Sequence, residues 1–289
     1  MNTITDTHIE QEQWDLIIEP KRAWYDLRLK QVWRYRDLVM LFVRRDFVSY
    51  YKQTILGPLW FLIQPLLTTI TFTVIFGQIA ALPTDGLPQF MFYLSGTVIW
   101  GYFAECLRKT SDTFIANANI FGKVYFPRLV MPISILFSNL ITFGIQFLLF
   151  LAFLAFFLIS GSAISVTWYV LVLPLLLFLM AGLGLGFGII ISSLTTKYRD
   201  LRFLVTFGVQ LWMYATPVIY PVSSIPERWR WVVLVNPITP IVETFRYAFL
   251  GAGTVSWGML GYSFGFMIAV FFMGVVLFNR VEQTFMDTV

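Results

Sequence analysis

The chain contains one stretch, Leu129–Thr196, of 68 residues without an Asp, Glu, Lys or Arg. Small and polar residues from Ser160 to Thr167 divide it into two apolar segments, 129–159 and 169–196. A hydrocarbon layer of about 30 Å is crossed by about 20 helical residues. Neither segment has the polar stripe that a helix of a water-soluble protein carries. The stretch therefore predicts two transmembrane helices and an integral membrane protein.

Composition agrees with this prediction and excludes several kinds of chemistry. Of the 289 residues, 58% are hydrophobic and 12% are charged, whereas soluble domains carry about 25% charged residues. The single cysteine, Cys106, excludes an internal disulfide and a metal cluster of several cysteines. The single histidine, His8, lies in a polar stretch and leaves the apolar segments without imidazole groups. We therefore expect no catalytic residue, no metal site and no cofactor in this chain.

Four more apolar segments are candidates to cross the membrane. With the two above they give six predicted spans, at about 59–82, 89–104, 129–159, 169–196, 203–222 and 258–278. The segment 223–257 is amphiphilic and interrupted by Pro226, Pro237 and Pro240, and its apolar pieces are too short to cross. Two half-helices that enter from the outer side, with their backbone buried in protein, suit this segment. The predicted fold class is an all-α integral membrane protein of six transmembrane helices with a re-entrant outer segment.

Residues 1–53 form a polar region ahead of the six-span domain, 54–289. This region holds nine Lys or Arg and eight Asp or Glu residues. Charged residues recur there at the three- and four-residue spacing of one helix face, at Arg22, Asp26, Lys30, Arg34 and Asp37. The pattern predicts an amphipathic cytoplasmic helix on the membrane surface, with Trp24, Tyr25 and Trp33 at the depth of the lipid headgroups. A solvated helix that packs against a partner is the alternative.

The distribution of basic residues predicts the orientation of the chain. Six spans place both termini on one side, and 17 of the 20 Lys and Arg residues then lie on that side. Because cytoplasmic loops are enriched in Lys and Arg, both termini are expected in the cytoplasm. The formal net charge of +4 follows from this asymmetry. Nucleic acid is therefore not needed as a partner.

The chain shows a pathway through the membrane but no source of energy. It contains no Gly-x4-Gly-Lys-Ser/Thr loop, so it is not expected to hydrolyse ATP itself. Gly182, Gly184, Gly186 and Gly188 lie within an apolar span, where their spacing favours close helix packing. The predicted spans also lack the ionisable groups that ion-coupled transporters generally need. A separate subunit that supplies the energy is the natural inference.

Four blocks of residues occur in an order that is typical of one transporter family. They are Tyr51–Trp60 with Arg45-Asp46 upstream, Asn117–Arg128, Arg199–Leu201 with Thr216–Pro221, and Asn236-Pro237 with Arg246. Together they resemble the permeases of type-2 ABC (ATP-binding-cassette) exporters of cell-surface polysaccharides. The N-terminal region is most similar to that of the O-antigen, or lipopolysaccharide, branch. Teichoic-acid and capsule exporters are the related alternatives.

This resemblance implies an assembly and a substrate. The assembly is two copies of the permease, forming a channel, with two nucleotide-binding subunits that carry ATP and Mg²⁺. The substrate is a polysaccharide on a polyprenyl-diphosphate lipid, moved outward across the bacterial inner membrane. The loop 105–128 corresponds to the family's coupling segment. The residues expected to contact the nucleotide-binding subunit are Asp112, Asn117, Asn119, Lys123, Pro127 and Arg128, the alternative being an ordinary positively charged cytoplasmic loop.

Two further groups of residues are candidates for contact with the partner or the substrate. Arg44, Arg45, Asp46 and Lys52 lie where the N-terminal region meets the first span, and either hold the partner, attract the lipid diphosphate or anchor the chain at the membrane. Aromatic rings stack loosely on the apolar faces of sugars and would let a polymer slide. The candidate conduit residues are Tyr93, Trp100, Tyr102, Phe103, Trp212, Tyr214 and Tyr220.

The outer segment contains the last candidate residues and the basis of a rival function. Glu243 and Arg246 either close the exit of the conduit or form a salt-bridged structural cap. A membrane-embedded transferase acting on lipid-linked sugar would need clustered polar residues, and Glu227, Arg228, Glu243 and Arg246 are the outer group that could supply them. A type-2 exporter of lipids or drugs is the rival within transport.

Overall fold

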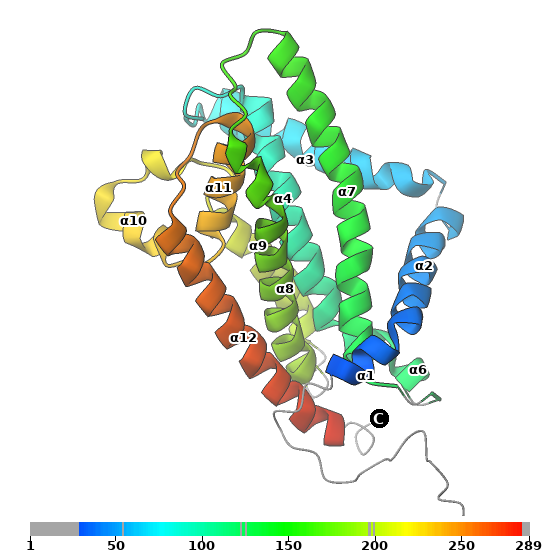
Figure 1. Cartoon of the computed structure of the whole chain (residues 1–289). Helices are drawn as coiled ribbons and strands as arrows, with labels where there is room; N and C mark the ends of the chain where they lie inside the picture. The colour runs from blue at the N-terminus through cyan, green and yellow to red at the C-terminus, as the bar shows by residue number, and fades with distance from the viewer. Residues whose placement is uncertain are drawn as a thin grey trace, which may run out of the picture.

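The computed structural model describes residues 29–53, 55–121, 123–124, 126–195, 198 and 200–284, and the regular elements of these residues are helical (Figure 1). Five helical stretches are long and apolar enough to cross a membrane: Gly57–Ile79, Gln89–Ser111, Val130–Ile159, Trp168–Thr195 and Trp257–Leu277. The prediction of an all-α membrane protein is therefore confirmed for the described part of the chain. The predicted span 203–222 is not among the five, so the count of six stays a prediction.

Helix α4 (Gln89–Ser111) lies at the centre of the bundle and packs against α7 (Val130–Ile159) and α8 (Leu173–Thr195). The chain enters α8 through a 3-10 turn, η3 (Trp168–Val172), and α8 also packs along α12 (Trp257–Thr284). Figure 1 shows these helices running side by side over most of the height of the molecule. Because α4 lies between α7 and α8, its span is the most buried of the five.

The glycines of α8 allow this helix to approach two neighbours closely. A Cβ atom at Gly184 would lie 2.7 Å from the Cβ atom of Cys106 in α4. A Cβ atom at Gly186 would lie 3.0 Å from the backbone nitrogen of Phe271 in α12. Alternate glycines therefore face α4 and α12, which confirms the packing role predicted from their spacing.

Two helices precede the bundle, α1 (Leu29–Arg34) and α2 (Arg36–Gln53). Helix α2 packs against α7 through a small apolar cluster that includes Val39, Phe42 and Met131. The first part of the amphipathic pattern, from Arg22 to Asp26, lies outside the described residues, so the interface helix stays a prediction. Trp33, which is described, is exposed.

Helix α3 (Trp60–Phe72) begins after a 3-10 turn, η1 (Gly57–Leu59), and is followed by a π-helical turn, η2 (Thr73–Ile79). Pro58 lies at the start, where its missing N–H leaves no intrahelical bond unmade. The helix continues through Pro65. Figure 1 shows α3 crossing α7 at a steep angle, and α3 contacts both α7 and α4.

Helix α9 (Leu201–Ala215) has 15 residues and covers about 22 Å, less than the hydrocarbon layer. None of its residues is buried, and the chain then turns inward, so that Thr216, Val218 and Ile219 are buried. After a 3-10 turn, η4 (Val222–Ser224), the predicted outer segment forms α10 (Glu227–Leu234) and α11 (Thr239–Leu250). Two helices therefore occupy this segment, and its entry into the membrane stays a prediction.

The end of α4 differs from the predicted boundary. The second span was expected to end at Ala104, but α4 continues to Ser111, so the predicted loop 105–128 begins as part of this helix. Two short helices follow, α5 (Thr113–Ala116) and α6 (Ala118–Phe121). Charged residues begin at Glu105, and the helix can extend beyond the apolar layer because each α-helix satisfies its own backbone groups.

Candidate functional site

A groove of about 570 Å³ opens between α3, α4, α7 and α9. Along α4 its lining extends from Thr97 to Lys109, which corresponds to about 18 Å of helix. Helix α9 forms one wall, and its lack of buried residues shows that this wall is only lightly packed on the rest of the chain. A groove of this length in the apolar part of the molecule is a candidate substrate path.

The walls of the groove carry amide and hydroxyl groups. Three helices each contribute one glutamine and one threonine four residues apart, namely Gln64 and Thr68 of α3, Thr142 and Gln146 of α7, and Thr206 and Gln210 of α9. The three threonine hydroxyls bond to the carbonyl four residues earlier in their own helix, at 3.0–3.3 Å. Polar groups facing lipid would be costly. Their convergence on one groove indicates that the groove holds water or a polar ligand.

This polar lining was missed by the sequence analysis, which looked for aromatic residues instead. The segments that form α3, α7 and α9 each carry a glutamine and a threonine four positions apart, and that spacing places both on the same helix face. The pattern was therefore visible in the sequence. The sequence alone does not show that α3, α7 and α9 turn these faces toward one another.

Charged residues lie at the end of the groove beside the C-terminal end of α4. Glu105, Arg108 and Lys109 line it there, and the carboxylate of Glu105 pairs with both cations. Arg202 at the start of α9 forms an ion pair with Asp112, directly after α4. One end of the groove is therefore charged and the other is uncharged.

The aromatic candidates are divided between the groove and the core. Trp100 and Tyr214 line the groove. Tyr93, Tyr102 and Phe103 are buried within the core of the chain. Two others support the end of α9: the indole N–H of Trp212 donates to the Asn236 side-chain oxygen (3.3 Å), and the Tyr220 hydroxyl to the carbonyl of Tyr214 (3.2 Å). A conduit role for these residues stays a prediction, and it is supported for Trp100 and Tyr214 by their position alone.

Arg246 and Glu243 lie inside the protein, at 2% and 4% exposure. The Arg246 guanidinium donates to the carbonyl oxygens of Pro217 and Val218, the latter at 2.6 Å, where the chain leaves α9. It lies 3.8 Å above the ring of Phe92 and 3.6 Å from Glu243 Oε1. Arg246 therefore ties the end of α9 to α4 and α11.

Burial acts on both charges of this pair. It raises the pKa of the Glu243 carboxyl, and the positive charge of Arg246 opposes that shift. It lowers the pKa of the Arg246 guanidinium to about 10, and Glu243 opposes this in turn. Glu227 and Arg228 are exposed on α10, so the four residues considered for a transferase divide into a buried pair and an exposed pair.

The sequence model of the ABC-2 type transporter family matches residues 37–250, from α2 to the end of α11. The chain belongs to this family. It is 30% identical over 253 residues to the O-antigen export system permease protein RfbA of Klebsiella pneumoniae, which covers 87% of this chain and 94% of that protein. It is 25% identical over 240 residues to the polysialic acid transport protein KpsM of Escherichia coli, with 81% and 89% covered.

Membership in the ABC-2 family makes the chain a multi-pass membrane permease and implies an ABC ATPase partner. The segment expected to contact that partner is anchored by its aromatic residues. Phe121 stacks on Phe126 at 5.5 Å between centroids, and Phe126 contacts Phe42 of α2. Arg128 lies over the ring of Phe121. The segment therefore has a fixed apolar base.

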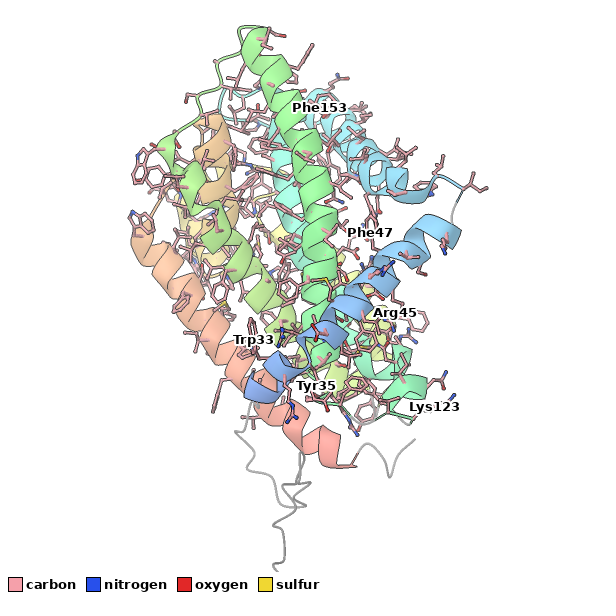
Figure 2. The ribbon with its side chains drawn as sticks, turned by 45° about the vertical axis from the view of Figure 1, so that its right-hand side comes forward. Trp33, Tyr35, Arg45, Phe47, Lys123 and Phe153 are labelled. Carbon is pink, nitrogen blue, oxygen red and sulfur yellow. The ribbon has the colours of Figure 1, made fainter. Side chains whose placement is uncertain are left out.

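Other residues of this segment point outward from its base. Asn119 and Lys123 are exposed, and Figure 2 shows Lys123 at the periphery of the molecule. Asn117 donates to the carbonyl of Thr113 at 3.0 Å, and Pro127 is half-buried. Asp112 forms an ion pair with Arg202. Contact of these residues with an ABC ATPase stays a prediction.

The basic candidates of α2 lie apart from the groove in this ABC-2 permease. Arg45 pairs with Asp46 at 2.8 Å and lies over the ring of Phe42. Arg44 and Lys52 are exposed. None of these four candidates is among the described residues that line the groove, and Figure 2 shows Arg45 on the outer side of α2. Their contact with a lipid diphosphate or with the partner stays a prediction.

Proposed function

We propose that the chain is the permease subunit of an ATP-driven exporter of an O-antigen-type polysaccharide linked to polyprenyl diphosphate. The observation that carries this proposal is the groove lined by glutamine and threonine side chains between α3, α4, α7 and α9. Sugar hydroxyls need hydrogen-bond partners inside a membrane, and amide and hydroxyl groups supply both donors and acceptors. The relative named an O-antigen export permease supports the choice of substrate.

The groove becomes a conduit when a second copy of the chain closes its open side. Two grooves facing each other across a two-fold axis enclose a polar path, and the uncharged part of each groove lets a neutral polymer move without being held tightly. In this assembly α9 and the turn after it form the fifth of six spans. Helices α10 and α11 form the re-entrant outer segment, and both termini lie in the cytoplasm of a bacterial inner membrane.

ATP and Mg²⁺ are bound by two partner subunits. Residues 1–53 lie at the cytoplasmic surface, and residues 54–289 form the transmembrane domain. Asn119 and Lys123 contact the partner, and the aromatic base of the segment transmits the partner's movement to α2 and α7. A capsule polysaccharide is the alternative substrate, because the relative named a polysialic acid transport protein matches 81% of this chain.

Replacing the three groove glutamines with methionine should lower export. Met matches the length of Gln but cannot bond to a sugar hydroxyl, and each lost bond is worth about 1 kcal/mol. We expect Gln64→Met, Gln146→Met and Gln210→Met together to reduce polymer at the cell surface by about tenfold or more, with normal amounts of permease. Surface polymer is measured by antibody in cells that lack the wild-type permease.

The control for the glutamine variants is Leu211→Met, at the exposed neighbour of Gln210. It introduces the same residue with little change in volume, and export should stay normal. Wild-type export in the triple variant would remove the groove from the substrate path. Co-purification of an ABC ATPase whose activity changes with the permease tests the other half of the proposal.

Reversing the exposed charge of the coupling segment should uncouple the two subunits. Lys123→Glu reverses the charge that this exposed side chain presents to the partner, and charges at an interface affect both partner choice and affinity. We expect export and permease-dependent ATP hydrolysis to fall severalfold, with membrane insertion unchanged. Arg228→Glu on exposed α10 is the control. If Lys123→Glu leaves both activities at the wild-type level, Lys123 does not contact the partner.

A further inference from the structure

Two cations lie next to each other at the charged end of the groove. Arg108 and Lys109 stand one helical turn from Glu105, and their side chains are 49% and 36% exposed. Their immediate neighbours Leu107 and Thr110 are buried. The turn therefore presents its charged side chains to the groove and its other side chains to the core.

A buried amide holds one of these cations in place. The Lys109 ammonium donates to the Asn139 side-chain oxygen of α7 at 2.8 Å. Asn139 is 2% exposed, and its NH₂ group donates to the Cys106 sulfur at 3.6 Å. The second contact sets which end of the amide faces Lys109. An amide buried in an apolar helix and used to orient a lysine at a groove is typical of a binding site, since the same helix could have carried an apolar residue.

The charge of this end of the groove suits an anion. Among the described residues that line the groove, the charged ones are two cations and one carboxylate, which leaves one positive charge in excess. The pairs with Glu105 are partly exposed and contribute little to stability. An anion can therefore compete for the cations. Arginine binds phosphate oxygens through two parallel N–H groups, and lysine adds a point charge.

We infer that Arg108 and Lys109 bind the diphosphate of a sugar diphosphate whose sugar lies against Gln64, Gln146 and Gln210, with Asn139 as a positioning residue. This site rests on the proposed function, because it takes the groove as the substrate path. A diphosphate has oxygens for both cations, and the neighbouring amide and hydroxyl groups suit the attached sugar. The site replaces Arg44, Arg45 and Lys52 as the place for the diphosphate, since these α2 residues do not line the groove.

Direct binding to the purified permease tests this site without export or ATP. The full chain is placed in nanodiscs of zwitterionic lipid and titrated with inorganic diphosphate, farnesyl diphosphate and UDP-glucose. Arg108→Gln and Lys109→Gln should each weaken binding by about tenfold or more, as expected for a hydrogen bond to a charged group. Arg108→Lys should recover part of the affinity. Arg228→Gln, an exposed arginine of α10, should bind as the wild type does.

The variant Asn139→Asp tests whether Asn139 positions Lys109 or only stabilises the fold. It keeps the size and the acceptor oxygen of the side chain but adds a negative charge beside Lys109. We expect weaker diphosphate binding with a smaller dependence on salt, while the thermal midpoint of the purified chain stays within a few degrees of wild type. Tighter binding of farnesyl diphosphate than of UDP-glucose assigns the site to a lipid-linked sugar, and the reverse assigns it to a soluble one.

Wild-type affinity for all three probes in Arg108→Gln and Lys109→Gln would overturn the site. Because the titration uses neither the ATPase nor export, that result would leave the proposed function standing. Conversely, a permease that binds diphosphate through these residues but exports no polysaccharide would keep the site and overturn the proposed function.

Discussion

Arg246→Met is expected to abolish export and to reduce the amount of folded permease. The substitution leaves the carbonyls of Pro217 and Val218 and the carboxylate of Glu243 buried without the guanidinium. Removing one partner of a buried charge pair costs about 3–5 kcal/mol. The damage falls at the end of α9, which has no buried residue of its own to hold it. Heating the detergent-solubilised protein and measuring the folded fraction by size-exclusion chromatography checks the stability.

Two further variants separate the ion pair from the carbonyl bonds of Arg246. In Glu243→Gln with Arg246→Met, the buried charge is gone but the two carbonyls remain unpaired, so we expect only partial recovery. Arg246→Lys keeps the charge and loses the forked geometry, so its stability should lie between that of Arg246→Met and that of the wild type. Arg228→Met on α10 should leave stability unchanged. Full recovery in the double variant would mean that charge balance, and not the tie to α9, is what Arg246 provides.

The spans could be predicted from the sequence because the bilayer imposes a simple rule. Apolar length and the absence of charge located all five spanning helices, including α7 and α8 within the uncharged stretch. The rule fails at helix ends, where charge no longer marks a boundary. Helix α4 continues past Glu105 to Ser111, and α9 stops at Ala215 although apolar residues follow it. There the chain turns because Thr216 and Val218 pack into the core.

The candidate site was less predictable, since it depends on which helix faces meet. Aromatic residues were the obvious signal in this chain, yet Tyr93 and Phe103 lie in the core because large rings fill the space between packed helices. Gln64, Gln146 and Gln210 line the groove, but an isolated glutamine carries no information on its neighbours. Asn139 illustrates the same limit, because its role depends on Lys109 and Cys106 in another helix.

Gly184→Ala is expected to prevent the permease from accumulating in the membrane. The added Cβ atom would lie 2.7 Å from the Cβ atom of Cys106 and 3.2 Å from the backbone nitrogen of Leu107. Neither atom can move without shifting α4, which forms the centre of the bundle. Overpacking costs about 1–3 kcal/mol when side chains can adjust, and more is expected where backbone must move. Membrane-fraction immunoblots and the thermal midpoint of the purified chain measure the effect.

The control for Gly184→Ala is Gly144→Ala in α7, where a new Cβ atom meets nothing within 4 Å. That variant should be at least as stable as the wild type, because alanine favours a helix over glycine by about 1 kcal/mol. Combining Cys106→Gly with Gly184→Ala removes the Cβ atom of α4 that the new alanine would contact. This double variant should accumulate to a higher level than Gly184→Ala alone. If Gly184→Ala accumulates as well as Gly144→Ala, then α4 and α8 are not packed at backbone distance. The groove, whose longest wall is α4, would then have a different shape.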